Sequence, residues 1–305
     1  MRRWPLGLVL WLLVLAGAEL VAFVMVCRFF VQTRHGQLLD TAALTGNRIG
    51  QDHIGDLVLT VLDTITALSV VAATATVGFI ALIRRRIAVA FGVVVLVAGA
   101  SATSQVLKRL IPRPDLGVDL QRAAVGNSLP SGHTTIAASV AVALVLALPA
   151  GVRGIVAILG AFGAAIVGVA TLSAGWHRPS DAVAALLIVG AWASVAGVFI
   201  VVAQRRHGDV DYGPANWRAV LALVAAGAVL LAGAALTLKL TDQVIATPAD
   251  QLSRGRLFVA YAGGSMGIAA AVSLIMASVL ATVHRVVPQA VVPLAQGENA
   301  GVVEG

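Results

Sequence analysis

Long apolar runs recur along the whole of this 305-residue chain and restrict the folds that it can adopt. A typical run holds about 20 residues, the length at which an α-helix crosses the hydrocarbon core of a bilayer. Charged residues make up only 11% of the chain, whereas a typical soluble domain has about 25%. The sequence therefore predicts an integral membrane protein.

The expected fold class is all-α, a polytopic transmembrane helical bundle, because a helix satisfies its own backbone hydrogen bonds in lipid. A transmembrane β-barrel would instead show segments of about ten residues with alternating hydrophobicity. We expect eight spans, with bounds near residues 5–30, 57–83, 87–110, 133–150, 154–175, 180–203, 217–239 and 257–283. They divide into a six-span core at 1–203, two additional spans at 204–284 and a flexible tail at 285–305.

The N-terminal run is expected to be an uncleaved first span. Arg2 and Arg3, the apolar run after them and Ala16-Gly17-Ala18 resemble a secretory signal peptide. The apolar stretch continues to Val26, however, which is too long for a signal-peptide core. After this span, the polar segment 32–56 is expected to hold a surface helix in the membrane interface.

The formal net charge of +7 indicates membrane topology, and no nucleic-acid partner is expected. If the spans alternate in direction, one side of the membrane holds Arg2, Arg3, Arg84, Arg85, Arg86, Arg153, Arg205, Arg206, Arg218 and Arg285. The positive-inside rule makes this side cytoplasmic. The opposite side holds a basic cluster against the rule, formed by Lys108, Arg109, Arg113, Arg122 and Arg178. A functional site would explain this cluster, and ordinary loop arginines are the alternative.

Two short polar segments, Leu129–Thr134 and Gly175–Asp181, interrupt the apolar runs. Alternation of the spans places the adjoining ends of the third to sixth spans on one membrane face. That face would carry Lys108, Arg113, Ser131, His133, His177 and Asp181. The chain has one cysteine, Cys27, which excludes a disulfide within the chain and a site of several thiolates.

Each polar segment has a chemical and a purely structural interpretation. Ser131 is a suitable helix N-cap, and Gly132 leaves the first backbone N–H groups open to an anion beside His133. Asp181 lies where it can orient the His177 imidazole and leave its other nitrogen free to attack. The structural alternatives are a capped helix with an incidental histidine, and an aspartate that only caps its helix.

The basic residues complete a possible site for phosphate chemistry. Lys108 and Arg113 flank the turn at Pro112 and offer charge to phosphate oxygens. Phosphoryl transfer mainly requires positioning and charge stabilisation. Two histidines and an aspartate could instead bind a divalent ion, but the neighbouring cations would repel it, so no metal and no cofactor is expected.

These residues resemble the type 2 phosphatidic acid phosphatase superfamily, membrane lipid phosphatases related to vanadium haloperoxidases. Pro130-Ser131-Gly132-His133 matches the second motif of the family, and His177 and Asp181 match the third. The resemblance covers about residues 5–203, the six-span phosphatase-like core. It implies that His177 takes the phosphoryl group, Asp181 orients it and His133 protonates the leaving oxygen. It also implies a phosphate site formed by Lys108, Arg113, Ser131 and Gly132.

Two departures from the family pattern concern the phosphate-binding arginines. Lys108 and Arg113 are separated by four residues instead of six, and the six-residue spacing falls on Asp115. The Ser-Arg pair of the third motif falls on Ala170-Thr171. The missing charge is expected to come from Arg178, with Arg109 and Arg122 as alternatives.

The expected function is hydrolysis of a lipid phosphate or diphosphate through a phospho-His intermediate. Polyprenyl diphosphate, phosphatidate and phosphatidylglycerophosphate are the substrate classes considered, at the outer face of a bacterial inner membrane. One alternative keeps the site and transfers the phosphoryl group to another hydroxyl. The other is a catalytically weak phosphate-binding protein, such as a transporter or scaffold. The expected partners are the lipid substrate and the bilayer, and the oligomeric state stays open.

Overall fold

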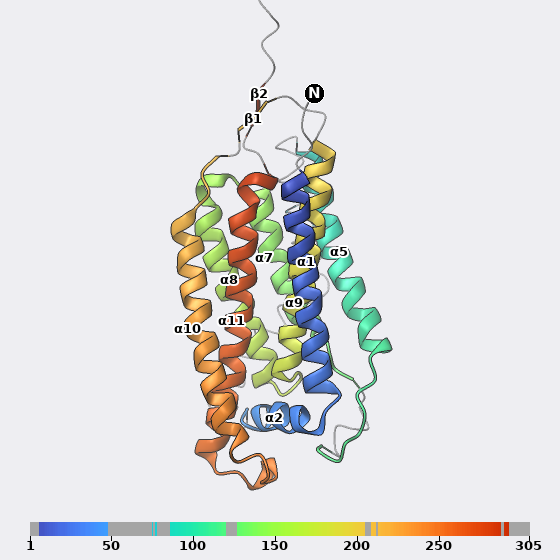
Figure 1. Ribbon diagram of the computed structural model, residues 1–305, viewed down its shortest axis with the longest axis vertical. Coiled ribbons are helices and arrows are strands. Elements are labelled where there is room, and N and C mark those ends of the chain that lie inside the picture. Colours follow the sequence, from blue (N-terminus) through green and yellow to red (C-terminus); the bar gives the residue numbers. More distant parts are fainter. Residues whose placement is uncertain are drawn as a thin grey trace, which may run out of the picture.

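The computed structural model describes residues 6–47, 75, 77, 86–119, 127–204, 209–211, 213–287 and 290–292. Its long helices lie side by side in one bundle, and a short helix lies across one end (Figure 1). The helices are α1 (Leu6–Val26), η1 (Cys27–Val31), α2 (Arg34–Thr45), α5 (Ile87–Leu110), α7 (Gly132–Ala147), α8 (Ala150–Ser173), α9 (Pro179–Ala203), α10 (Trp217–Asp242), η3 (Ala249–Gln251) and α11 (Arg254–Val286). The all-α polytopic fold is therefore confirmed.

Six helical segments are long and apolar enough to cross a membrane, among the residues that the structure describes. They are Leu6–Val31, Ile87–Leu110, Ala150–Ser173, Pro179–Ala203, Trp217–Asp242 and Arg254–Val286. The span expected at 133–150 is the shorter helix α7, which ends at Ala147. A proline disfavours helical backbone at the residue before it. Leu148 precedes Pro149, so α7 ends at this point. The span expected at 57–83 lies outside the described residues.

The helix expected in the polar segment after the first span is α2, which lies across the end of the bundle (Figure 1). Thr33 caps it, since the Thr33 hydroxyl accepts a hydrogen bond from the Gly36 amide at 3.0 Å. Its buried side chains include Leu39, Ala42 and Ala43. The helix is thus packed onto the bundle and closes that end.

Helix α9 occupies the centre of the bundle. It packs against α1, α5, α7, α8 and α11. Its side chains Leu186, Val189 and Ile200 are fully buried. By contrast, α1 and α10 expose large apolar side chains such as Leu10 and Val229, as helices in contact with lipid tails would. The N-terminus of α9 is consequently enclosed by other helices at the end covered by α2.

Helix α11 packs tightly against this end of α9. A side-chain Cβ at Gly264 would lie 2.5 Å from Pro179 Cγ and 3.4 Å from Ala43 Cβ. Helix α11 also packs on α8 and α10. Small residues permit such close approach between membrane helices, so α11 supports the start of α9 and α2 directly.

A Gly264→Val substitution is expected to lower the free energy of unfolding by about 1–3 kcal/mol, the usual cost of overpacking. The measurement is thermal unfolding of the detergent-solubilised protein. Gly163→Val is the matched control, because a Cβ at Gly163 meets no atom within 4 Å. Equal stability of the two variants would contradict the packing argument.

At the opposite end of the bundle, β1 (Asp209–Asp211) pairs antiparallel with β2 (Ala290–Val292) (Figure 1). The segment expected as a flexible tail therefore begins with the last residues of α11 and includes a paired strand. Near this end, the buried Arg153 donates to the carbonyl of Leu148 at 3.0 Å and to that of Val287 at 3.2 Å. These contacts close the end of the bundle that lies away from α2.

Candidate active site

The polar residues singled out in the sequence meet at the end of the bundle that α2 covers (Figure 1). The C-terminal ends of α5 and α8 and the N-terminal ends of α7 and α9 lie there. His133 lies within electrostatic range of His177 and Lys108, and Lys108 within range of Asp181. These residues thus lie at one end of the bundle, as expected if the spans alternate in direction.

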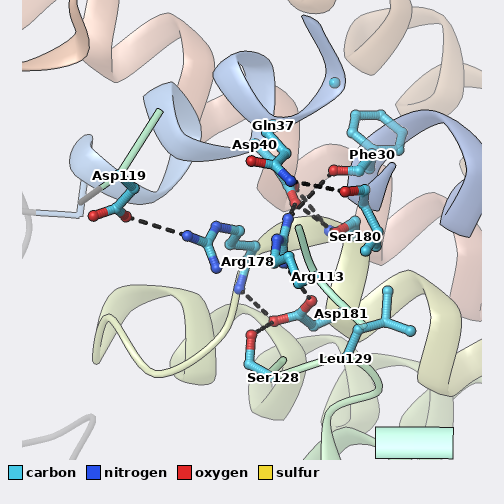
Figure 2. A network of polar contacts seen from close by, with 12 residues as sticks. Phe30, Gln37, Asp40, Arg113, Asp119, Ser128, Leu129, Arg178, Ser180 and Asp181 are labelled. Atoms are coloured by element: carbon cyan, nitrogen blue, oxygen red, sulfur yellow. Dashed lines mark hydrogen bonds and ion pairs between the residues drawn. The ribbon is translucent and has the colours of Figure 1, made fainter. Parts of the chain in front are cut away.

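The centre of the site is the pair formed by His177 and Asp181. His177 Nδ1 lies 3.3 Å from Asp181 Oδ2. The same carboxylate oxygen accepts from the Arg178 amide at 3.1 Å and from the Ser128 hydroxyl at 2.6 Å (Figure 2). Asp181 therefore both caps α9 and contacts the imidazole, and Nε2 is the imidazole nitrogen left for another partner.

A tight turn after α8 sets the place of His177. Gly175 adopts a left-handed φ of 73°, which a residue without a Cβ tolerates at no steric cost. The amides of Trp176 and His177 then donate to the Thr171 carbonyl at 3.0 and 3.2 Å. Thr171 stands where the family has an arginine; it is fully buried, and its hydroxyl donates to the Gly168 carbonyl at 2.8 Å. Thr171 therefore holds the turn before His177 and offers no charge to a phosphate.

The start of α7 faces the same region. The fully buried Ser131 is the N-cap, and its hydroxyl accepts from the Thr134 amide at 3.4 Å and the Thr134 hydroxyl at 3.0 Å. The Ser131 amide donates to the Asp181 carbonyl at 2.9 Å, which joins α7 to α9. A Cβ at Gly132 would meet no atom within 4 Å, so the first turn is open beside its amide. The helix start expected from the sequence is present.

His133 is half-buried next to the turn that carries His177. Its ring centroid lies 5.5 Å from that of Trp176, and the side chain of Trp176 is exposed. Lys108 lies in the last turn of α5 and is also half-buried. Lys108 thus reaches the site from α5, and His133 reaches it from the neighbouring helix α7.

Arg113 lies between two carboxylates. Its Nη2 lies 3.2 Å from Asp40 Oδ2 and donates to the Phe30 carbonyl at 3.3 Å, and its Nη1 lies 3.6 Å from Asp181 Oδ1 (Figure 2). Only 7% of its side chain is exposed. The guanidinium expected to bind phosphate thus faces carboxylates in this structure.

Arg178 also has a carboxylate partner. Its Nη2 lies 3.2 Å from Asp119 Oδ2, while its buried Nε has no hydrogen-bond partner (Figure 2). Burial and the nearby Arg113 lower the pKa of the Arg178 guanidinium, whereas Asp40, Asp181 and Asp119 act in the opposite direction. Of the two alternatives to Arg178, Arg109 is exposed and Arg122 lies outside the described residues.

Four polar residues of this site were not expected from the sequence: Asp40, Asp119, Ser128 and Ser180. Asp40 comes from α2 and is 2% exposed. Burial raises its pKa, and the neighbouring Arg113 opposes this effect. A carboxylate between Leu39 and the apolar pair Ala42-Ala43 was the available signal for Asp40, because an acid within an apolar stretch needs a partner.

A cavity of about 890 Å³ lies beside the site, between α2 and the connection from α10 to α11. Asp119, the partner of Arg178, is part of its lining, together with Thr45, Asn47 and Asp250. Among the described residues, no group of three or more His, Cys, Asp or Glu side chains is arranged to hold a metal ion.

Residues 87–207 match the family model described as the PAP2 superfamily. This segment runs from α5 through α9 and includes Lys108, Ser131, His133, His177 and Asp181. No curated protein and no solved structure matches the chain. The family resemblance expected from the motifs is confirmed over this segment, and it implies phosphatase activity on phosphate esters.

Proposed function

We propose that this protein is a membrane phosphatase that hydrolyses a lipid phosphate or diphosphate through a phospho-His177 intermediate. The observation that carries the proposal is the buried His177–Asp181 pair, 3.3 Å apart, at the N-terminus of the central helix. It lies beside the open first turn of α7 and within electrostatic range of His133. A nucleophile, its orienting carboxylate and a second imidazole are the groups that covalent phosphoryl transfer uses.

The proposed reaction has two steps. His177 Nε2 forms a bond to phosphorus while the bond to the lipid oxygen breaks, and protonated His133 donates its proton to that oxygen. Water then attacks phospho-His177, and His133 takes a proton from the water. The products are the lipid alcohol, or lipid monophosphate, and inorganic phosphate, and His177 and His133 return to their initial states.

Cations and backbone donors would stabilise the phosphoryl oxygens in the transition state. Lys108 contributes a charge close to His133. The Gly132 amide lies at an open helix N-terminus, which favours anions. The buried Arg178 Nε, which has no partner, can add a charge-assisted hydrogen bond. Ser131 can donate its hydroxyl proton to the phosphate, because its hydroxyl oxygen is the acceptor in both hydrogen bonds with Thr134.

The lipid nature of the substrate is supported by the position of the site. It lies at the end of a bundle whose outer helices α1 and α10 expose apolar side chains, so a head group at the interface could reach it from the bilayer. The substrate classes proposed are polyprenyl diphosphate, phosphatidate and phosphatidylglycerophosphate. The positive-inside rule supports the outer face of a bacterial inner membrane for this end.

Phosphate release from these three lipids by the purified protein in detergent tests the proposal. We expect release from at least one of them. Absence of release from all three, with the protein folded, would contradict the phosphatase function.

The cavity beside Asp119 favours one alternative, a phosphotransferase. A bound acceptor alcohol in this cavity could replace water in the second step, because phospho-His can transfer to either. Product analysis with labelled lipid separates the two, since a labelled phosphate ester of the acceptor identifies a transferase. A catalytically weak phosphate-binding protein is supported only by Asp115 and Thr171 at the two altered motif positions.

A His133→Gln variant is expected to lose about 10²- to 10⁴-fold in kcat with a lipid substrate, the usual contribution of general acid–base catalysis. With an aryl phosphate that has a good leaving group, formation of phospho-His177 should lose much less, because that oxygen needs no proton. Burst kinetics with both substrates measure the effect. An equal loss of the burst rate with both would contradict the role of His133 as the acid.

A further inference from the structure

Asp40 contacts two separate parts of the site, although it comes from the short helix α2 that lies across the end of the bundle. Its Oδ2 lies 3.2 Å from Arg113 Nη2 and accepts from the Ser180 hydroxyl at 2.5 Å. Its Oδ1 accepts from the Ser180 amide at 3.2 Å. Ser180 is the residue immediately before Asp181 at the start of α9. Asp40 therefore fixes both Arg113 and the helix turn that carries the catalytic carboxylate.

Arg113 extends this arrangement to Asp181. Asp181 Oδ2 is occupied by His177, the Arg178 amide and the Ser128 hydroxyl. Asp181 Oδ1 has no hydrogen-bond partner, and it faces Arg113 Nη1 at 3.6 Å. Figure 2 shows the Arg113 side chain between Asp40 and Asp181. The four side chains thus form a continuous series, Asp40–Arg113–Asp181–His177.

We propose that Asp40 is a positioning residue for the reaction, acting through Arg113 on the Asp181–His177 pair. This inference rests on the proposed function. It gives Arg113 a positioning role in place of the direct phosphate contact expected from the sequence. The buried guanidinium keeps the Asp181 carboxylate oriented toward His177 Nδ1, so that Nε2 points to the phosphorus. Helix α2 then contributes a positioning side chain to the site in addition to closing this end of the bundle.

Because the series is buried, loss of one of its charges is expected to have a large effect on the others. Arg113 has 7% and Asp40 1% of its side chain exposed, and removal of one partner from a buried ion pair leaves the other charge uncompensated. A small displacement of Asp181 would turn His177 away from the phosphorus, and a misplacement of about 1 Å can cost about 100-fold in rate. Loss of Asp40 should therefore lower kcat and leave ground-state binding largely intact.

The first test compares Asp40→Asn with Asp242→Asn. Asn at 40 keeps an oxygen for the Ser180 amide and removes the charge that holds Arg113. Asp242→Asn also removes a carboxylate that contacts α2, through His35 at 2.9 Å, but both of those side chains are half-exposed. We expect kcat to fall about 10- to 100-fold in Asp40→Asn, with the KM and the Ki of inorganic phosphate within about twofold of wild type. Asp242→Asn should match the wild type.

Two further variants separate positioning from phosphate binding. In Arg113→Lys, kcat should fall while the Ki of inorganic phosphate stays unchanged, and adding Asp40→Asn should lower kcat little further, because both changes break one series. A rise of the phosphate Ki in Arg113→Lys as large as the fall in kcat would show that Arg113 binds phosphate and would overturn the proposal. If Asp40→Asn does not fold, Ser180→Ala replaces it as the test, because it removes only the hydroxyl that donates to Asp40. We expect a smaller fall in kcat for this variant.

A readout without turnover keeps this inference apart from the proposed function. In protein labelled with ¹⁵N-histidine, we expect a downfield proton on His177 Nδ1, assigned with a His177→Asn variant. Asp40→Asn should shift or broaden this signal, and Asp242→Asn should not. An unchanged signal together with an unchanged kcat overturns the positioning role. If the wild type hydrolyses no lipid, the proposed function fails, and the proton signal still decides whether Asp40 positions His177.

Discussion

A His177→Asn variant is expected to lose phosphate release by about 10⁴-fold or more, because the nucleophile carries the covalent step and residues of such a unit act together. The imidazole Nε2 of His177 is the only protein atom in the proposed mechanism that bonds to phosphorus. The measurement is release of inorganic phosphate from the best lipid substrate.

His284→Asn is the matched control for this variant, since His284 lies in the last turn of α11, at the end of the bundle away from the site. It should keep wild-type activity. Residual activity of His177→Asn within about tenfold of wild type would indicate direct attack by water and remove the covalent intermediate from the mechanism.

The second largest effect is expected for Asp181→Asn, with a fall in kcat of about 10³- to 10⁴-fold. The magnitude follows the loss seen when the carboxylate that orients a catalytic histidine becomes an amide and the imidazole takes the wrong tautomer. The Asn oxygen can still accept from the Arg178 amide and the Ser128 hydroxyl, which now lie 3.1 and 2.6 Å from the carboxylate. The helix cap is therefore kept while the charge beside His177 and Arg113 is lost.

This variant also decides between the two interpretations of Asp181. A residue that only caps α9 would tolerate Asn with a change in kcat of a few fold at most. Thermal unfolding should accompany the kinetics, because Arg113 loses one of its two carboxylates. Ser128→Ala removes one neutral partner of Asp181 and should have a much smaller effect on kcat.

The local parts of the site were predictable from the sequence because the interacting residues lie within one or two helical turns. Ser131 caps the helix that begins after it, and Asp181 reaches back four residues to His177. These contacts follow from backbone geometry at a helix N-terminus. The membrane-length helices were predictable for a similar reason, since apolar length alone indicates a span.

The long-range contacts were not predictable in the same way. Asp40 and Arg113 are 73 residues apart, and Asp40 and Ser180 are 140 apart. Their pairing depends on how α2 packs under α9, and no local pattern specifies that packing. The same holds for Arg178, which was expected to bind phosphate and which pairs with Asp119, 59 residues away.

Trapping of the phosphoenzyme is a direct test of the covalent intermediate on His177. The protein is mixed with ³²P-labelled lipid substrate, quenched in base because phosphohistidine hydrolyses in acid, and analysed by peptide mapping. We expect transient label on the peptide that contains His177 and no label in His177→Asn. In His133→Gln with a labelled aryl phosphate as the donor, the label on His177 should accumulate. Turnover of the lipid without labelled protein, or with label on another residue, would contradict the covalent intermediate on His177.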